Sequence, residues 1–251
     1  MTNWTQKPRL GFDTETTGIN IYTDRIVTCS LIYTCPLVAR PKKPFLSGAI
    51  QELSNTTYRE KKYWIINPGI PIPQAATRVH GITTEQAVSQ GQNPKNALEE
   101  IASLISSHMN AGNPLIAYNA GFDLSILNRE LERNNLIPLT QRLIKISPVI
   151  DPYYLDKYLD KYRRGPRKLQ HLLEHYCSDN ERNFHNAEAD VYATLDIVDA
   201  MIAHYEQLKN TSLDTIQEYA HIAHTDTVTY FKRKAEENGT TNDDSFEWPI
   251  A

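Results

Sequence analysis

Cysteine is scarce in this chain of 251 residues. There are three cysteines, Cys29, Cys35 and Cys177, and no two of them have the CxxC spacing of a metal-binding or redox pair. An odd number of scattered cysteines argues against a disulfide framework and a zinc knuckle, and it suits a reducing compartment. No apolar run approaches the length of a membrane span, and the first residues lack the pattern of a signal peptide. We therefore expect a cytoplasmic protein without a membrane partner.

The chain also lacks an excess of positive charge. It has 26 Lys and Arg residues against 30 Asp and Glu residues, which gives a formal net charge of −4. Such a chain has no overall positive field, so any contact with nucleic acid must come from a local basic patch or through metal ions. The motifs GxSxG, GxxxxGK[ST] and GxGxxG are absent from the sequence. Their absence excludes serine hydrolases of that type, P-loop proteins and dinucleotide-binding proteins.

The hydrophobic pattern predicts an α/β domain. Five short apolar or β-branched segments predict strands, at residues 9–15, 26–33, 63–66, 115–118 and 149–151. Apolar residues at helical spacing predict helices around 97–108, 124–131 and 191–205. Three strands followed by alternating helices and strands describe a layered domain with a mixed sheet. The polar segment 36–62 predicts a long hairpin tip or a surface excursion.

Two carboxylates stand at the end of the first predicted strand, in the stretch GFDTETTG at residues 11–18. Asp13 and Glu15 are two residues apart, and side chains at i and i+2 of a strand point to the same face. Like charges held this close repel, so one acid stays protonated unless a cation neutralises both. Hard divalent cations such as Mg²⁺ and Mn²⁺ prefer carboxylate oxygen. A metal site is one interpretation, and a strand end whose acids pair with Lys or Arg is the other.

Two further acids and a histidine lie at the ends of other predicted elements. Asp123 follows the strand at 115–118, where it either joins the first two acids or caps the next helix. Asp190 falls in the first turn of the last predicted helix of the domain, beside its apolar stripe, so its side chain can face the sheet. His185 lies just before that helix. Four acids and one histidine thus occupy the ends of neighbouring elements of the predicted sheet.

Three stretches of the sequence, FDTETTG, NAGFD and HNAEAD, resemble in this order the motifs of the DnaQ-like exonucleases, the DEDDh branch of the 3′–5′ exonucleases. The segment INPGIPIPQAATRVHGIT, at 66–83, resembles the family's connection between the third strand and the first helix. The resemblance implies a ribonuclease H-like fold, with a mixed five-stranded sheet flanked by helices, over residues 8–208. Residues 209–251 lie outside it, and we expect them to form a C-terminal helix and a flexible tail.

The resemblance also implies a two-metal hydrolysis of phosphodiester bonds, with two Mg²⁺ or Mn²⁺ ions. Asp13 would bridge the ions, Glu15 and Asp190 would complete the protein ligands of one ion, and Asp123 would hold the second ion largely through water. His185 would be the general base. The pKa of a histidine lies near neutrality, and a position on a turn would let this side chain move in once substrate is seated.

Six further residues are candidates for binding the terminal nucleotide: Thr16, Thr17, Gly18, His80, Asn119 and Phe122. Small residues and free backbone amides at 16–18 would let a nucleotide approach closely. In the family, the residue after the first motif's Glu and the Asn and Phe of the second motif line the nucleotide pocket. His80 is either a contact to the 3′-terminal nucleotide or a capping or buried structural histidine.

Two other segments have more than one interpretation. The densest basic stretch, at 157–168, includes Arg163, Arg167 and Lys168, and is either a solvated loop or a rim that tracks phosphates. The apolar end at 246–250 either docks on a polymerase or other partner, or folds back onto its own domain.

The sequence as a whole predicts a metal-dependent 3′–5′ exonuclease that releases nucleoside 5′-monophosphates from nucleic acid 3′ ends. Single-stranded or frayed DNA is favoured over RNA as the substrate. No polymerase region is present, so a proofreading role would need a separate polymerase or another replication or repair partner. Two alternatives stay open. One is an exoribonuclease of the same superfamily, since contacts to a 2′-hydroxyl are not evident from sequence. The other is a catalytically silent module that binds nucleic acid or a polymerase.

Overall fold

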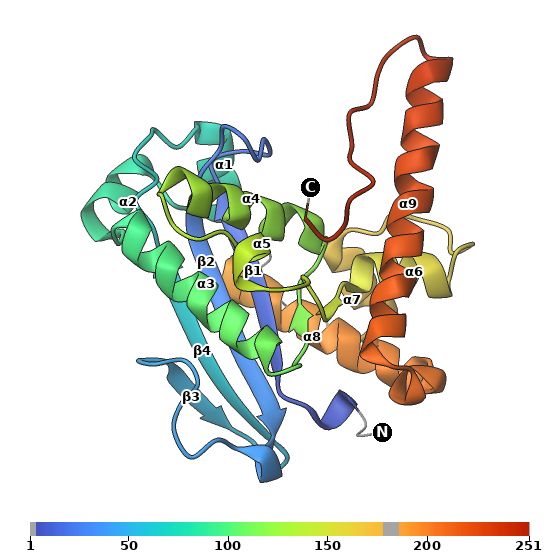
Figure 1. Ribbon diagram of the computed structural model, residues 1–251, viewed down its shortest axis with the longest axis horizontal. Coiled ribbons are helices and arrows are strands. Elements are labelled where there is room, and N and C mark those ends of the chain that lie inside the picture. Colours follow the sequence, from blue (N-terminus) through green and yellow to red (C-terminus); the bar gives the residue numbers. More distant parts are fainter. Residues whose placement is uncertain (1–3, 178–185, 251) are drawn as a thin grey trace.

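A computed structural model describes residues 4–177 and 186–250. A six-stranded mixed sheet in the order β3-β4-β2-β1-β5-β6 forms its centre (Figure 1). The strands are β1 Arg9–Thr16, β2 Ile26–Pro36, β3 Ile50–Leu53, β4 Thr57–Ile65, β5 Leu115–Ile116 and β6 Val149–Ile150. Strands β1 to β4 pair antiparallel, whereas β5 and β6 run parallel to β1. The carboxyl ends of β1, β5 and β6 therefore meet at one edge of the sheet.

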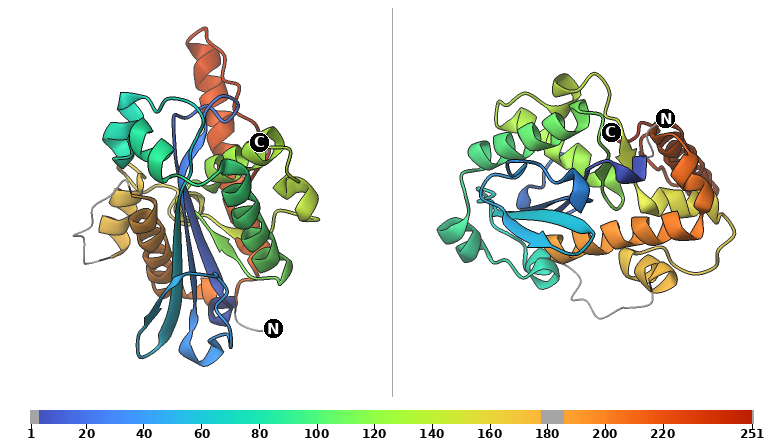
Figure 2. Two further views of the ribbon diagram at one scale, coloured as in Figure 1. Left: turned by 90° about the vertical axis from the view of Figure 1, so that its left-hand side faces the viewer. Right: turned by 90° about the horizontal axis from the view of Figure 1, so that it is seen from below.

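Helices cover both faces of this sheet (Figure 2). Helices α3 (Pro94–Asn110) and α4 (Ala120–Arg133) lie on one face, where they share an apolar core with Leu10, Phe12 and Leu31 of the strands. Helix α8 (Ala187–His204) packs on β1 and β2 from the other face, around Ile32, Ile116 and Ile150. Strand β2 is buried along its first ten residues because both faces of the sheet are covered.

The fold class predicted from the sequence is confirmed, with one strand more than expected. Strand β3 lies inside the segment 36–62 and pairs with the first half of β4, which begins at Thr57 and not near residue 63. Four consecutive charged residues, 59–62, lie in this part of β4, so the segment has the composition of a polar excursion. One of them, Glu60, is fully buried and accepts hydrogen bonds from the backbone of Phe45 and Leu46 and from the Tyr58 hydroxyl. The long hairpin is therefore packed against the domain.

The remaining helices surround the sheet edge and extend the domain. They are α1 Gln74–His80, α2 Thr84–Gln90, α5 Leu139–Arg142, α6 Pro152–Leu159, α7 Leu169–Tyr176 and α9 Leu213–Glu237, with 3-10 turns at Trp4–Gln6, Leu37–Ala39 and Glu206–Asn210. The predicted C-terminal helix is α9, which packs on α6 and then projects from the body (Figure 1). The tail folds back beside it, and Trp248 is buried in the main core. Within the described part of the chain, no helix has the length and apolar character needed to cross a membrane.

Candidate active site

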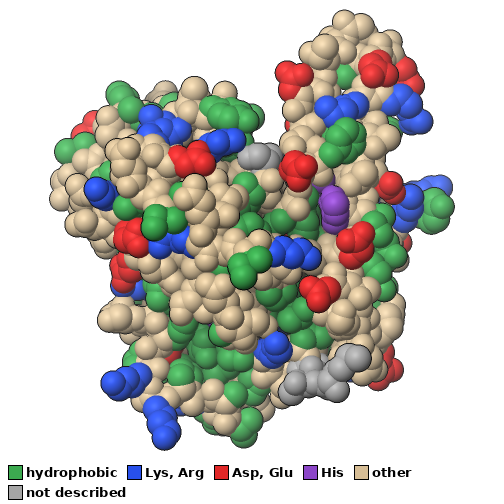
Figure 3. Space-filling view, viewed as in Figure 1, with side chains coloured by type: hydrophobic (Ala, Val, Ile, Leu, Met, Phe, Trp, Pro, Cys, Tyr) green, Lys and Arg blue, Asp and Glu red, His purple; other side chains and the backbone are tan. Residues whose placement is uncertain are grey.

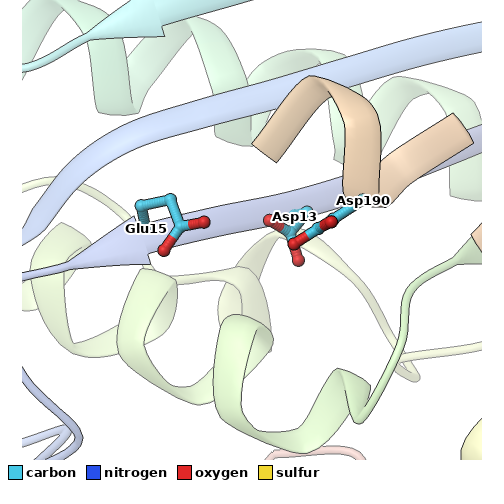
Figure 4. A group of neighbouring side chains, drawn as sticks. All are labelled: Asp13, Glu15 and Asp190. Atoms are coloured by element: carbon cyan, nitrogen blue, oxygen red, sulfur yellow. The ribbon is translucent and has the colours of Figure 1, made fainter. Parts of the chain in front are cut away.

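Three carboxylates from two distant parts of the chain converge at the end of β1. Asp13, Glu15 and Asp190 each have an oxygen within 4.8 Å of the others. Figure 4 shows the Asp13 and Asp190 carboxylates side by side, with Glu15 beyond them along the strand. The i, i+2 spacing places the first two on one face of β1, and Asp190 comes from the first turn of α8. The convergence predicted from the sequence is therefore present.

A glycine in β1 lets α8 come close enough for this convergence. A Cβ atom at Gly11 would lie 2.4 Å from Cγ1 of Val191, which is closer than side chains can pack. Val191 directly follows Asp190 in α8, so the contact between strand and helix sets the position of the acid. Asn186 caps the same helix, because its Oδ1 accepts a hydrogen bond from the Glu188 backbone at 2.9 Å.

The electrostatics of the acids are those of a site that favours positive charge. Burial raises the pKa of Asp13 well above its ordinary value, and the neighbouring Asp123, Asp190 and Glu15 raise it further. Burial and the charges of Asp190 and Asp123 also raise the pKa of Glu15 to about 7. Mutual repulsion of this kind is relieved by a cation between the carboxylates.

Asp123 lies beside the three clustered acids but is held by different contacts. Its Oδ1 accepts hydrogen bonds from the backbone N–H of Thr14 at 2.9 Å and from the Thr14 hydroxyl at 2.6 Å. Burial raises the pKa of Asp123 to about 7, although the hydrogen bonds from Thr14 oppose this. Asp123 is in the first turn of α4, whose N-cap is Asn119, so the alternative that Asp123 caps this helix is wrong.

These acids fit the divalent ions that the family resemblance implies. Asp13, Glu15 and Asp190 offer hard oxygen ligands at mutual distances that a single ion spans, and their neighbourhood raises the pKa of two of them. Asp123 stands outside this group of three, which is compatible with a second ion held mainly through water. The predicted general base, His185, lies outside the described residues, and the description resumes at Asn186.

The residues that follow Glu15 are held in the connection between β1 and β2, where the Thr17 backbone N–H donates to the Arg25 carbonyl at 2.9 Å. Thr17 is buried, and its hydroxyl donates to Oδ1 of Asp24 at 2.8 Å. A Cβ atom at Gly18 would lie 2.6 Å from the same carboxylate, so a larger residue there would have to displace the Asp24 side chain. The Thr16 hydroxyl donates to the Gly18 carbonyl at 2.6 Å. These contacts show what Thr17 and Gly18 do for the turn, and their role in substrate binding stays a prediction.

His80 lies next to this strand end. Its Nδ1 accepts a hydrogen bond from the backbone of Ile82 at 3.1 Å, which fits the capping interpretation. Burial lowers the pKa of His80, and a backbone hydrogen bond with Thr16 partly offsets this effect. A histidine that is neutral near pH 7 and adjacent to Thr16 is placed to contact a nucleotide there, so both interpretations remain compatible with its position.

The second motif is positioned by an acid that the sequence analysis did not single out. Asp151 is fully buried, and its two carboxylate oxygens accept hydrogen bonds from the backbone of Asn119 at 3.0 Å and of Ala120 at 2.9 Å. It also caps α6 through the Tyr153 backbone. Asn119 has a left-handed conformation, with φ of 54°, which the bonds to Asp151 hold. The sequence signal that could have identified Asp151 as a helix cap is the proline that follows it, since an Asp-Pro pair often starts a helix.

A cavity of about 430 Å³ opens beside the acids and joins the two predicted motifs. Its lining includes Asp13, Asp123, Asn119 and Phe122. Arg167 and Lys168 line the same cavity, so the end of the basic stretch reaches the site. Lys168 is exposed and free to meet a phosphate, as the rim interpretation requires.

Most of the basic stretch is nevertheless occupied by internal contacts. Asp156 is fully buried and pairs with the guanidinium groups of Arg163 and Arg167. The Tyr176 hydroxyl donates to the same carboxylate at 2.8 Å, and Lys161 pairs with Asp226 on α9 at 3.0 Å. The loop is therefore fixed to the domain and is not a freely solvated segment.

Residues 10–198 match the RNase_T family of exonucleases, a span that includes all the acids described above. The chain belongs to this exonuclease family. DNA polymerase III subunit epsilon of Treponema pallidum is 27% identical over 194 residues, which cover 77% of this chain and 76% of the relative. The PolC-type DNA polymerase III of Streptococcus agalactiae is 28% identical over 184 residues, 73% of this chain but 10% of that protein.

Solved structures show the same fold. A zinc-bound complex of Escherichia coli exonuclease I with single-stranded DNA superimposes with a TM-score of 0.62 at 21% identity, covering 82% of this chain. The chain spans 42% of that structure. A second structure of exonuclease I gives a TM-score of 0.63. Together with the family match, these relatives confirm the resemblance to the DnaQ-like exonucleases and the ribonuclease H-like fold.

Proposed function

We propose that this exonuclease degrades DNA from its 3′ ends and depends on two Mg²⁺ or Mn²⁺ ions. The observation that carries the proposal is the convergence of Asp13, Glu15 and Asp190 within 4.8 Å, with Asp123 alongside. A cluster of acids repels a phosphodiester unless cations lie between them. The site would therefore bind substrate only when it holds metal ions.

The relatives support the direction and the substrate. Epsilon subunits belong to DNA polymerase III, and the exonuclease I structure contains single-stranded DNA and zinc. Carried to this chain, these features favour a single-stranded or frayed DNA end as the substrate. They also favour a separate polymerase or another replication or repair partner in the cytoplasm. The three cysteines form no disulfide with one another, which is compatible with a reducing compartment.

The roles of the individual residues follow from their positions. Asp13, Glu15 and Asp190 would hold one ion, Asp13 would share the second, and Asp123 would hold it largely through water. When bound, the ions would stabilise the negative charge on the attacking and leaving oxygens while the phosphodiester bond is hydrolysed. His185 would take the proton of the attacking water as general base, and it lies one residue before the N-cap of α8.

The cavity beside the acids would seat the terminal nucleotide. Thr16, His80, Asn119 and Phe122 would contact the sugar and base, because they lie around the end of β1 and the start of α4. Lys168 would meet the phosphate on the following nucleotide.

The proposal is tested with a DNA oligonucleotide that carries a label at its 3′ terminus. The label should be released as a nucleoside 5′-monophosphate with Mg²⁺ or Mn²⁺, and it should be retained in EDTA. Asp13→Asn and His185→Gln should each reduce release by at least about 100-fold. A matched RNA oligonucleotide should be degraded more slowly. Faster cleavage of RNA would show that RNA and not DNA is the preferred substrate. Release of the label in EDTA would contradict the metal-dependent mechanism.

A further inference from the structure

A second cavity continues from the one that contains the acids. It has a volume of about 330 Å³, and it shares Asn119, Phe122 and Tyr153 with the first cavity. The two cavities therefore adjoin at these three residues, in the first turns of α4 and α6. In the space-filling view, the end of α9 and the tail project from the rest of the molecule, and a notch separates this projection from the main body (Figure 3).

The outer wall of the second cavity comes from α9 and the C-terminal tail. Phe231 of α9 and Trp248 of the tail line it, facing Phe122 and Tyr153 of the domain. Both outer residues lie beyond the span 10–198 that matches the exonuclease family. The outer wall of the second cavity is thus a feature of this chain and not of the family's shared domain.

Internal contacts fix this wall. The two ring nitrogens of His224, on α9, bond to the Tyr154 hydroxyl at 3.0 Å and to the Ser245 carbonyl at 3.1 Å. Lys232 donates to the Asn242 carbonyl at 2.9 Å, and the Trp248 ring meets Tyr154 edge-on at 6.2 Å. The tail is therefore held in place against α9 and α6 without a ligand, and a ligand would meet a preformed surface.

The chemistry of the cavity suits a flat aromatic group and not a phosphate. Phe122, Tyr153 and Phe231 present rings, and base stacking on such rings does not depend on the identity of the base. None of the described residues that line this cavity is Lys or Arg, and two of them, Asp244 and Glu247, are acids. The lining therefore offers a phosphate no Lys or Arg, whereas the exposed Lys168 lines the first cavity.

A buried donor in the wall has no partner among the described residues. Trp248 is only 9% exposed, and its indole Nε1 makes no hydrogen bond with any described residue. That nitrogen lies on the side of Gly121, where an added Cβ atom would be 3.9 Å away, and both residues line the cavity. This nitrogen has no solvent access, so the Trp248 ring and not its N–H group contributes to the cavity lining.

We infer that this second cavity holds a nucleobase of the bound strand, adjacent to the nucleotide whose phosphate lies at the acids. The base stacks on the aromatic rings that line the cavity. This inference rests on the proposed function for the direction of the strand and the position of the scissile phosphate. It adds a specific role for α9 and the tail, which is to bind substrates longer than one nucleotide.

The test compares two substrates in three variants. A DNA oligonucleotide fills both cavities, whereas the 4-nitrophenyl ester of thymidine 5′-monophosphate has one nucleotide and fills only the first. Phe231→Ala and Trp248→Phe should each raise the KM for the oligonucleotide by at least about fivefold and leave the ester unchanged. Phe231 is 45% exposed, so its removal spares the fold. Tyr230→Ala is the matched control, since Tyr230 is 47% exposed on the same helix but does not line the cavity.

A binding measurement separates this inference from the proposed function. The affinity of each variant for a fluorescein-labelled oligonucleotide, measured by anisotropy with Ca²⁺ in place of Mg²⁺, should fall in Phe231→Ala and Trp248→Phe but not in Tyr230→Ala. Equal affinities in all variants, or an equal rise in KM for ester and oligonucleotide, would overturn the inference. If the wild type hydrolyses neither substrate, the proposed function is wrong, and the anisotropy comparison alone decides the role of the cavity.

Discussion

The backbone N–H and the side-chain hydroxyl of Thr14 both donate to one oxygen of Asp123, at 2.9 and 2.6 Å. Thr14 lies between the two acids of β1, and its side chain points to the opposite face from theirs. The same residue therefore fixes the first motif to the second. Burial raises the pKa of Asp123 to about 7, and the two bonds from Thr14 limit that rise by favouring the ionised form.

Thr14→Val should weaken metal-dependent hydrolysis. The substitution keeps the shape of the side chain but removes one hydrogen bond to a buried carboxylate, a contact of about 1.5–3 kcal/mol. We expect the rate at limiting Mg²⁺ to fall about tenfold or more, with partial recovery at saturating Mg²⁺. Thr34→Val is the control, because the hydroxyl of Thr34 is also buried but has no hydrogen-bond partner among the described residues. Equal rates for the two variants would show that the Thr14 hydroxyl does not orient Asp123.

Metal ions should stabilise the protein more at alkaline than at acidic pH. The raised pKa values of Asp13, Glu15 and Asp123 mean that the metal-free folded state binds protons that the unfolded state has already released, over a window from about pH 4 to about pH 7. The free energy of unfolding without metal therefore decreases as pH rises through this window. A bound cation removes the penalty, because it replaces the protons between the carboxylates.

Scanning calorimetry checks this expectation. The rise in Tm on replacing EDTA by saturating Mg²⁺ should be larger at about pH 8 than at about pH 6. The double variant Asp13→Asn, Glu15→Gln should show little metal effect at either pH and should be more stable than the wild type in EDTA at the higher pH. A metal effect that is independent of pH, or that persists in the double variant, would place the ions elsewhere.

The buried carboxylate of Asp156 should matter far more for stability than the exposed one of Asp226. Asp156→Ala leaves the guanidinium groups of Arg163 and Arg167 without their partner at a site with no solvent access, which costs about 3–5 kcal/mol. Asp226→Ala breaks an ion pair with Lys161 in which both side chains are more than half exposed, worth about 0–1 kcal/mol. Urea denaturation of the two variants gives the comparison. A loss of similar size in both would mean that Asp156 does not anchor the basic loop.

Much of the site could be predicted because its signals are local and periodic. The spacing of Asp13 and Glu15 on a strand dictates a shared face, and the apolar stripe beside Asp190 directs that helix onto the sheet. Asp123 follows an apolar strand whose carboxyl end lies at the same edge. The three motifs therefore converge for reasons that each short stretch already contains, and the order of the strands follows from the parallel pairing of β5 and β6 with β1.

The missed features depend on contacts between distant segments. Strand β3 is mostly exposed and β4 contains four consecutive charged residues, so only the burial of Glu60 beneath the hairpin reveals them as packed structure. Asp151 looked like the end of a strand, whereas its role is to hold the turn at Asn119, 32 residues earlier in the chain. The position of the tail is set by Trp248 against Tyr154 and by His224 against Ser245, pairs that no local pattern links.

The most direct test of the account is a crystal structure of the protein with Mn²⁺ and a DNA oligonucleotide that resists hydrolysis. Anomalous scattering should show two manganese ions about 4 Å apart, both contacting Asp13, with Glu15 and Asp190 completing one of them. The 3′-terminal phosphodiester should lie against both ions. Manganese absent from these carboxylates, or a strand bound with its 5′ end at the acids, would contradict the account.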